Sequence, residues 1–137
     1  MDSFAIFNVS ASGMKAQRER MNVTASNLAN AHTTRTEEGG PYKRKDVFFE
    51  TIPMGDDAAG VHQGVKVSDI VEDENKPALV YNPGHPDADV AGYVAMPNVN
   101  VIEEMVNMMM AMRAYEANVS TFNISKSMIA KSLEIGR

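Results

Sequence analysis

The sequence has no cysteine and no tryptophan, and none of its apolar runs is long. Without cysteine the chain can form no disulfide framework, no thiolate metal site and no cysteine nucleophile. This absence fits a reducing compartment, and it equally fits export by a route that involves no oxidising pathway. No segment reaches the roughly 20 apolar residues that a membrane-spanning helix needs. We therefore expect a chain that does not span a membrane.

The N-terminus also lacks the pattern of a secretory signal peptide. Such a peptide begins with basic residues and continues with an uninterrupted apolar run. This chain instead has Asp2 near its start and Asn8 inside its first apolar segment. If the protein leaves the cytoplasm, we expect a route that leaves its N-terminus uncleaved.

Residue patterns typical of catalysis and ligand binding are missing as well. The sequence has neither a glycine-rich phosphate loop between a strand and a helix nor a serine–histidine arrangement that suggests a triad. His32, His62 and His85 stand alone, without a second ligand at the spacing of a metal site. Glu103 and Glu104 would point about 100° apart on a helix, so they suit the positive end of a helix dipole better than an acid–base pair. We predict no enzyme, no metal, no cofactor and no small-molecule substrate.

The formal net charge of −5 is concentrated in the middle of the chain. Residues 33–100 carry six basic and twelve acidic side chains, whereas residues 1–32 have a net charge of +1 and residues 101–137 are neutral. Nearly neutral ends can pack closely against copies of themselves, while an acidic middle favours solvent. Nucleic-acid binding is not expected, because the only basic cluster, Lys43 to Lys45, is followed directly by Asp46.

Both ends of the chain repeat apolar residues at alternating spacings of three and four. This repeat of seven places one narrow stripe on each helix, as in a coiled coil. Because a lone helix cannot bury such a stripe, we expect the terminal helices to pack on each other or on copies in neighbouring subunits. The inner positions are Phe4, Phe7, Ala11, Met14, Arg18, Met21, Ala25 and Leu28 at the N-terminus, and Val101, Met105, Met108, Met112, Tyr115, Val119, Phe122, Lys126, Ile129 and Leu133 at the C-terminus.

Two charged residues, Arg18 and Lys126, stand at inner positions of these repeats. A charged residue in such a seam fixes the register of the helices at some cost in stability; alternatively, the stripe is exposed to solvent at these points. We favour register control. The methionine-rich turn from Met105 to Met112 suits a subunit that meets several different neighbours, because methionine is unbranched and adaptable.

Turn and cap residues mark the ends of both helices. The first helix is expected over residues 3–29 or 30, since asparagine, histidine and threonine residues that are poor in helix interiors follow. The second is expected over residues 101–135. Asn100 can cap its start, Glu103 can complete a capping box, and Gly136 supplies a stop.

Between the helices the apolar residues form short runs typical of strands, separated by loops rich in glycine and proline. The segment has few large apolar side chains, so its core must be thin. These runs lie in residues 42–52, 65–71, 79–81 and 93–96.

The sequence therefore predicts an α+β fold. Residues 1–32 and 101–137 would form a discontinuous coiled-coil domain of the two terminal helices. Residues 33–100 would form a small irregular β module inserted between them, on the outside of the helices.

Two terminal motifs resemble those shared by the bacterial flagellar rod and hook proteins. Residues 22–31, Asn-Val-Thr-Ala-Ser-Asn-Leu-Ala-Asn-Ala, close the N-terminal helix, and residues 113–118 read Arg-Ala-Tyr-Glu-Ala-Asn. Two further segments narrow the resemblance to a rod subunit. These are Pro41-Tyr42 after a glycine-rich loop, and residues 81–100 with their His-Pro-Asp and Gly-Tyr-Val sequences. The similarity covers essentially the whole chain.

The resemblance implies a structural subunit of the proximal rod, the drive shaft that crosses the bacterial periplasm. It implies copies of the chain and other rod proteins as partners, and export in unfolded form by the flagellar type III apparatus, with an N-terminal signal that is not cleaved. In this family the terminal helices form the tubular core and the middle segment faces outward. The assembly interface is then expected at Phe4, Phe7, Met14, Met21, Leu28, Asn27, Asn30, Met105, Met108, Met112, Tyr115, Val119, Phe122, Ile129 and Leu133.

Three of the residues singled out are polar. Asn27 and Asn30 would either form hydrogen bonds at the end of the first helix, where the chain turns into the β module, or bond directly between subunits. These two alternatives carry equal weight. His85 lies in a tight loop with Pro83 and Pro86, which we expect to contact the helical core or an adjacent subunit.

Two rival classes of protein are less consistent with the sequence. A membrane-active translocator or pore component built on amphipathic helices would need a polar face rich in lysine and arginine together with aromatic anchors, which these helices lack. A wall-cutting hydrolase attached to the rod would need carboxylates that converge on a concave site.

Overall fold

A computed structural model describes residues 3–54 and 62–136, with side chains from Ala5 onward within these ranges. The expected α+β fold is confirmed: two terminal helices enclose a segment with four short strands. In chain order the elements are α1 (Ser3–Ala29), β1 (Lys45–Pro53), β2 (Gln63–Glu72), β3 (Ala78–Tyr81), β4 (Tyr93–Met96) and α2 (Val101–Ile135).

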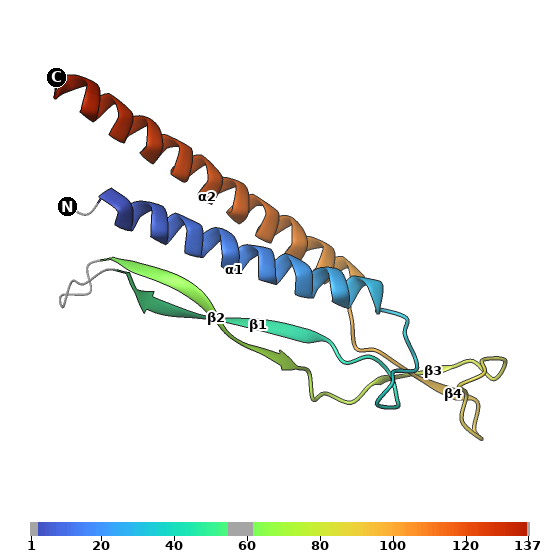
Figure 1. Cartoon of the computed structure of the whole chain (residues 1–137). Helices are drawn as coiled ribbons and strands as arrows, with labels where there is room; N and C mark the ends of the chain where they lie inside the picture. The colour runs from blue at the N-terminus through green and yellow to red at the C-terminus, as the bar shows by residue number, and fades with distance from the viewer. Residues whose placement is uncertain (1–2, 55–61, 137) are drawn as a thin grey trace.

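Helix α1 is the central element of the molecule. Figure 1 shows α2 along one side of α1 and the β1–β2 ribbon along the other, with the β3–β4 ribbon extending away from the end where α1 stops and α2 begins. The two helices are antiparallel, so both termini lie at the opposite end. Because α2 has 35 residues and α1 has 27, the last turns of α2 continue past the start of α1.

The ends of α2 form as its flanking residues predict. The side-chain oxygen of Asn100 accepts hydrogen bonds from the backbone N–H groups of Ile102 (3.1 Å) and Glu103 (3.4 Å), which have no partner inside the helix. At the other end the N–H of Gly136 donates to the carbonyl of Ser132. The second half of the expected capping box, a bond from the Glu103 side chain back to Asn100, is not among the hydrogen bonds of the described residues.

The four strands pair as two separate antiparallel ribbons. Strand β1 pairs with β2 from Lys45 opposite Glu72 to Pro53 opposite Gln63, with an irregularity between Phe48 and Phe49. Strand β3 pairs with β4 over four residues each. Two-stranded ribbons are marginal in water unless they pack on another element, and the β1–β2 ribbon lies along α1.

Ser12 connects α1 to the β1–β2 ribbon. Its hydroxyl oxygen accepts a hydrogen bond from the N–H of Val65 (3.1 Å), while the hydroxyl donates to the carbonyl of Val9 (2.7 Å). Gly64 allows this approach, because a Cβ atom there would lie 2.8 Å from the Ser12 oxygen. The ribbon can therefore sit close to the helix only at a residue without a side chain.

The thin core expected for residues 33–100 is confirmed, since Val94 is the one large apolar side chain buried in the described part of that segment. Among the described residues, the buried apolar side chains are those of Ala5, Ala16, Ala31, Val94 and Ala111. The largest fully buried side chains are Glu104, Val94 and Asn27, two of which are polar. Contacts between small residues and buried polar groups thus hold much of the subunit together.

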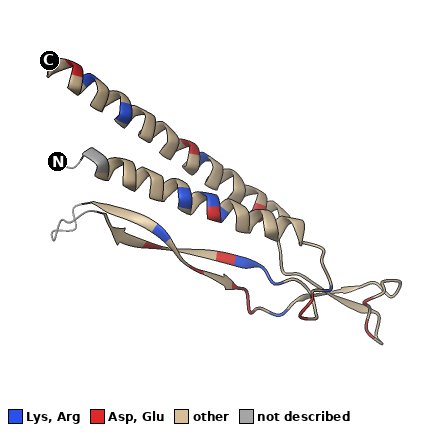
Figure 2. Ribbon diagram, viewed as in Figure 1, with Lys and Arg blue, Asp and Glu red and all other residues tan. Residues whose placement is uncertain are grey.

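Charge follows the same division as the fold. Figure 2 shows acidic residues along the strands and loops, whereas the helices carry residues of both signs. Within the described residues, neither helix combines the length and the apolar character needed to cross a membrane.

Candidate assembly surface and buried polar clamp

The inner positions predicted on α1 fall on two sides of the helix. Phe7, Met14, Met21 and Leu28 are partly covered, in keeping with a packed side of the helix. Ala11, Arg18 and Ala25, the alternate members of the same repeat, are exposed. The side chain of Phe4 lies outside the described part of the chain.

The predicted positions on α2 divide in the same way. Met108, Tyr115, Val119, Phe122 and Ile129 are partly covered. Met105, Met112 and Leu133 are instead 53%, 47% and 71% exposed. Within one subunit the predicted stripe is therefore only half covered, and the role of all these residues between subunits stays a prediction.

Within one subunit Arg18 and Lys126 do not lie between the two helices, because both side chains are exposed. One face of each helix packs within the subunit, and these two residues lie on another. Register control between subunits stays a prediction.

Contacts between the helices mix aromatic, small and polar residues. The rings of Phe7 and Phe122 lie 4.8 Å apart between centroids, a favourable aromatic distance. Gly13 lies against Asn118, since a Cβ atom on Gly13 would come within 2.9 Å of the Asn118 amide. Further along, Arg20 donates a hydrogen bond to the side-chain oxygen of Asn107 at 3.4 Å.

At the end of α1, the buried side chain of Asn27 joins three segments of the chain. Its amide nitrogen donates to the carbonyl of Lys45 (2.8 Å) and to the Glu104 carboxylate (3.0 Å). Its amide oxygen accepts from the N–H of Lys45 (2.9 Å) and from the hydroxyl of Tyr42 (3.0 Å). Both amide protons and both acceptor sites of Asn27 are thus used.

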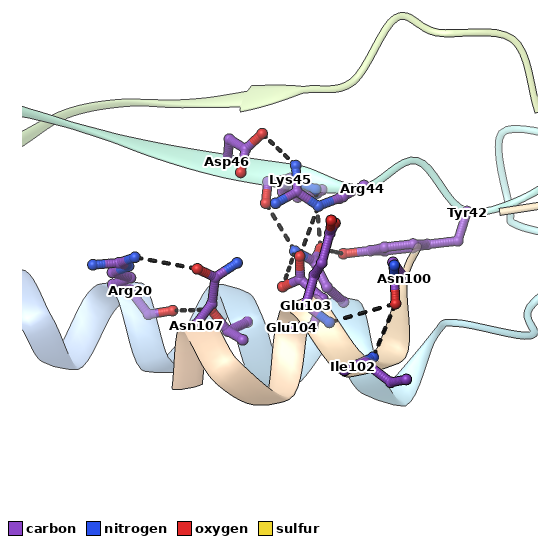
Figure 3. A network of polar contacts seen from close by, with 12 residues as sticks. Arg20, Tyr42, Arg44, Lys45, Asp46, Asn100, Ile102, Glu103, Glu104 and Asn107 are labelled. Atoms are coloured by element: carbon purple, nitrogen blue, oxygen red, sulfur yellow. Dashed lines mark hydrogen bonds and ion pairs between the residues drawn. The ribbon is translucent and has the colours of Figure 1, made fainter. Parts of the chain in front are cut away.

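The second centre of this network is Glu104, 1% exposed in the first turn of α2. One carboxylate oxygen accepts from Asn27 and the other accepts from Arg44 Nε at 2.7 Å (Figure 3). Arg44, which directly precedes β1, also forms an ion pair with Asp46 on that strand. A buried carboxylate needs a charged partner and hydrogen bonds on its remaining oxygen, and Glu104 has both. We call Asn27, Tyr42, Arg44 and Glu104 the polar clamp.

The Arg44 guanidinium stays protonated in this environment. Burial by itself would lower the pKa of the guanidinium, but the hydrogen bond and charge of Glu104, followed by those of Asp46, hold that pKa above its usual value. A raised pKa means that the stabilisation is fully present below the usual arginine pKa and is lost only at higher pH. The ion pair therefore stays intact on its arginine side throughout the physiological range.

The hydrogen bonds of Asn27 and Asn30 bear on the two alternatives given for these residues. Asn27 and Asn30 form hydrogen bonds at the end of α1, as in the first of the two alternatives: the Asn30 amide donates to the Ser26 carbonyl at 2.9 Å, and its oxygen accepts from Thr33 at 3.1 Å. Their bonding between subunits stays a prediction.

The buried ion pair between Glu104 and Arg44 was not predicted from the sequence. The position of Glu104 had been explained only by the helix dipole. It lies four residues before Met108, on the stripe that continues to Tyr115 and Phe122. Extending the covered stripe by one turn would have placed this glutamate between the helices, whereas no spacing in the sequence points to Arg44.

The loop of His85 is folded on itself and reaches the segment after α1. His85 Nδ1 accepts a hydrogen bond from the N–H of Asp87 at 3.1 Å. The Asp87 carboxylate in turn accepts from the Thr34 hydroxyl at 2.8 Å. Contact with an adjacent subunit through His85 remains a prediction.

Many large apolar side chains in the described part of the chain lie on its surface. On α2 they form a continuous set, which we call the outer face: Ile102, Met105, Val106, Met109 and Met112, between 47% and 74% exposed. The ribbons add Phe48, Leu79 and Tyr81, which are 55%, 68% and 65% exposed. Exposed apolar surface on this scale marks interaction sites. No group of three histidine, aspartate or glutamate side chains within the described residues is arranged to hold a metal ion.

An elongated α+β subunit with a thin core and an apolar exterior is a component of a larger assembly. Two family models match its ends: "Flagella basal body rod protein" over residues 7–35 and "Flagellar basal body rod FlgEFG protein C-terminal" over residues 90–135.

Similar curated proteins agree with the family models. The chain is 48% identical to a protein of Escherichia coli O6:H1 and 46% identical to one of Salmonella typhimurium, over 96% of each chain. It is 45% identical to a protein of Bacillus subtilis over the full length of both. All three are named flagellar basal-body rod protein FlgC. The chain therefore belongs to the FlgC family, and it is a structural protein of the flagellar rod.

Proposed function

We propose that this chain builds the proximal part of the rod by packing its two helices against copies of itself and against other rod proteins. The observation that supports this most is the outer face of α2, since exposed apolar side chains gathered on one face mark a site where a neighbour binds. Residues 1–32 and 101–137 would form the core of the shaft, and residues 33–100 would lie outside it.

Torque transmission follows from this packing. A shaft resists twisting when each subunit contacts several neighbours over large, closely packed surfaces. Within each subunit the polar clamp fixes the β1–β2 ribbon to the helix pair, because Asn27 of α1 bonds to Lys45 of β1 and to Glu104 of α2. Arg44, which directly precedes β1, also bonds to Glu104. Force on the outer segment then passes to the helices.

We further propose that the subunit reaches the periplasmic rod through the flagellar type III export apparatus with its N-terminus intact. The support for this route is that the chain belongs to a family of flagellar basal-body rod proteins. Mass spectrometry of the subunit from purified basal bodies tests it, because an N-terminus cut inside α1 would contradict the proposal.

The assembly proposal is tested by placing a charge on the outer face. In cells that lack their own copy of this subunit, Met105→Asp should abolish swimming and rod formation, because an unpaired charge buried at each contact costs several kcal/mol. Since Met105 is 53% exposed in the subunit, the purified variant should melt as the unchanged protein does. Ser120→Asp, at an exposed polar position of the same helix, is the matched control and should swim. Normal swimming with Met105→Asp would refute the role of the outer face.

A further inference from the structure

We propose that the outer face of α2 in one copy packs antiparallel on an exposed face of α1 in a second copy. This inference rests on the proposed function and names its contact. The α1 face consists of exposed residues at alternating spacings of four and three, and we call it the basic stripe: Ala11, Lys15, Arg18, Asn22, Ala25 and Ala29.

The two faces complement each other in shape. The outer face carries long side chains, with Met105 and Met109 one helical turn apart and 53% and 56% exposed. The basic stripe offers small ones at the same interval, with Ala25 and Ala29 one turn apart. In an antiparallel pair Met109 then lies opposite Ala25, and Met105 lies opposite Ala29. Knobs that face small residues allow two helices to approach closely, and methionine adapts to the gaps.

The same register pairs opposite charges. Arg18 precedes Ala25 by seven residues, and Glu116 follows Met109 by seven. An antiparallel pair that places Met109 on Ala25 must therefore place Glu116 at the level of Arg18, with Lys15 one turn away. Arg18 and Glu116 are both exposed. Neither takes part in an ion pair within residues 3–54 and 62–136.

The contact also gives neighbouring copies the same direction, as a shaft requires. Because α1 and α2 are antiparallel within each copy, an antiparallel contact between α2 of one copy and α1 of the next leaves the two copies parallel. The two faces differ, so the contact is heterologous. Each copy keeps one face free for a further neighbour, which produces a ring or an open helical array rather than a closed pair.

Cysteine cross-linking tests this contact, and the chain has no cysteine of its own. Cells without their own copy would express an Ala25→Cys chain together with a Met109→Cys chain, and their basal bodies would be oxidised. A disulfide needs Cα atoms within about 7 Å, so we expect a product of twice the subunit mass. The matched control replaces Ala25→Cys by Ala11→Cys, an alanine on the same stripe fourteen residues away, and should give none. No product, equal product in the control, or a product with a different protein would each overturn the inference.

Charge reversal checks the register. Arg18→Glu and Glu116→Arg should each lower the yield of the cross-link about fivefold, as expected for one exposed ion pair. The double reversal should restore it, while all three variants melt like the unchanged subunit. Absence of restoration would overturn the register. If the unchanged chain failed to restore swimming, the proposed function would be refuted. If the cysteine chains restored swimming but gave no cross-link, only the contact between the outer face and the basic stripe would be refuted.

Discussion

Replacing Glu104 by alanine should be among the most destabilising single changes in this subunit. The carboxylate is 1% exposed and receives hydrogen bonds from Asn27 at 3.0 Å and from Arg44 at 2.7 Å. Its removal leaves the Arg44 guanidinium, whose side chain is 22% exposed, without its buried partner. Breaking a buried ion pair from one side costs about 3–5 kcal/mol, and the unpaired Asn27 amide adds to that.

Glu104→Gln separates charge from shape. Glutamine keeps an oxygen that can accept from Arg44, but it removes the negative charge and adds donors beside the Asn27 amide. We expect a loss of about 1.5–3 kcal/mol, the range for a hydrogen bond to a charged group. The glutamine variant should therefore fall between the unchanged protein and the alanine variant.

Denaturant unfolding of the purified subunit, followed by helical circular dichroism, measures these differences. Glu103→Ala is the matched control, because its side chain is exposed in the same helical turn. Its change should stay within about 0.5 kcal/mol. If Glu104→Ala and Glu103→Ala unfolded at the same denaturant concentration, the polar clamp would not stabilise the subunit and the reasoning would be refuted.

Three further outcomes are expected. Ser12→Ala removes the acceptor of the Val65 N–H and should lower stability by about 1–2 kcal/mol; hydrogen exchange at Val65 should speed up more than exchange within α2, and unchanged protection would contradict this. Phe122→Asp should prevent swimming. It should also lower the melting temperature of the isolated subunit, because the ring centroids of Phe122 and Phe7 lie 4.8 Å apart, whereas a charge on the outer face should leave that temperature unchanged. His85→Ala should reduce rod yield modestly while the subunit keeps its melting temperature; an unchanged yield would make the loop a passive connector.

Local chemistry determined what could be predicted from the sequence. The start of α2 depends on Asn100 and its end on Gly136, residues whose effects act over one turn. Both ends lie where they were expected, although among the described residues the Glu103 half of the capping box is not formed. The strands follow from short β-prone runs between glycine and proline, and all four are present.

Contacts between distant segments could not be predicted in the same way. Arg44 and Glu104 are sixty residues apart, and nothing in their spacing connects them. The stripe of α2 that packs within the subunit includes Glu104, Ala111 and Asn118, which a search for apolar repeats passes over. Met105 and Met112, which such a search selects, are exposed, because they lie on a side of α2 that does not pack within the single chain.

Because few large apolar side chains are buried in one copy, the free energy of unfolding is expected to be lower for a lone copy than for a copy bound to its neighbours. Few apolar side chains are almost completely buried in a single copy, namely four alanines and one valine within the described part of the chain. At about 25 cal/mol per Å², each neighbour that covers the outer face adds a contribution that the lone chain lacks. Binding partners raise the free energy of unfolding by mass action. The same sequence can thus be easy to unfold before it joins the rod and hard to remove afterwards, so that incorporation proceeds in one direction without any change in covalent structure.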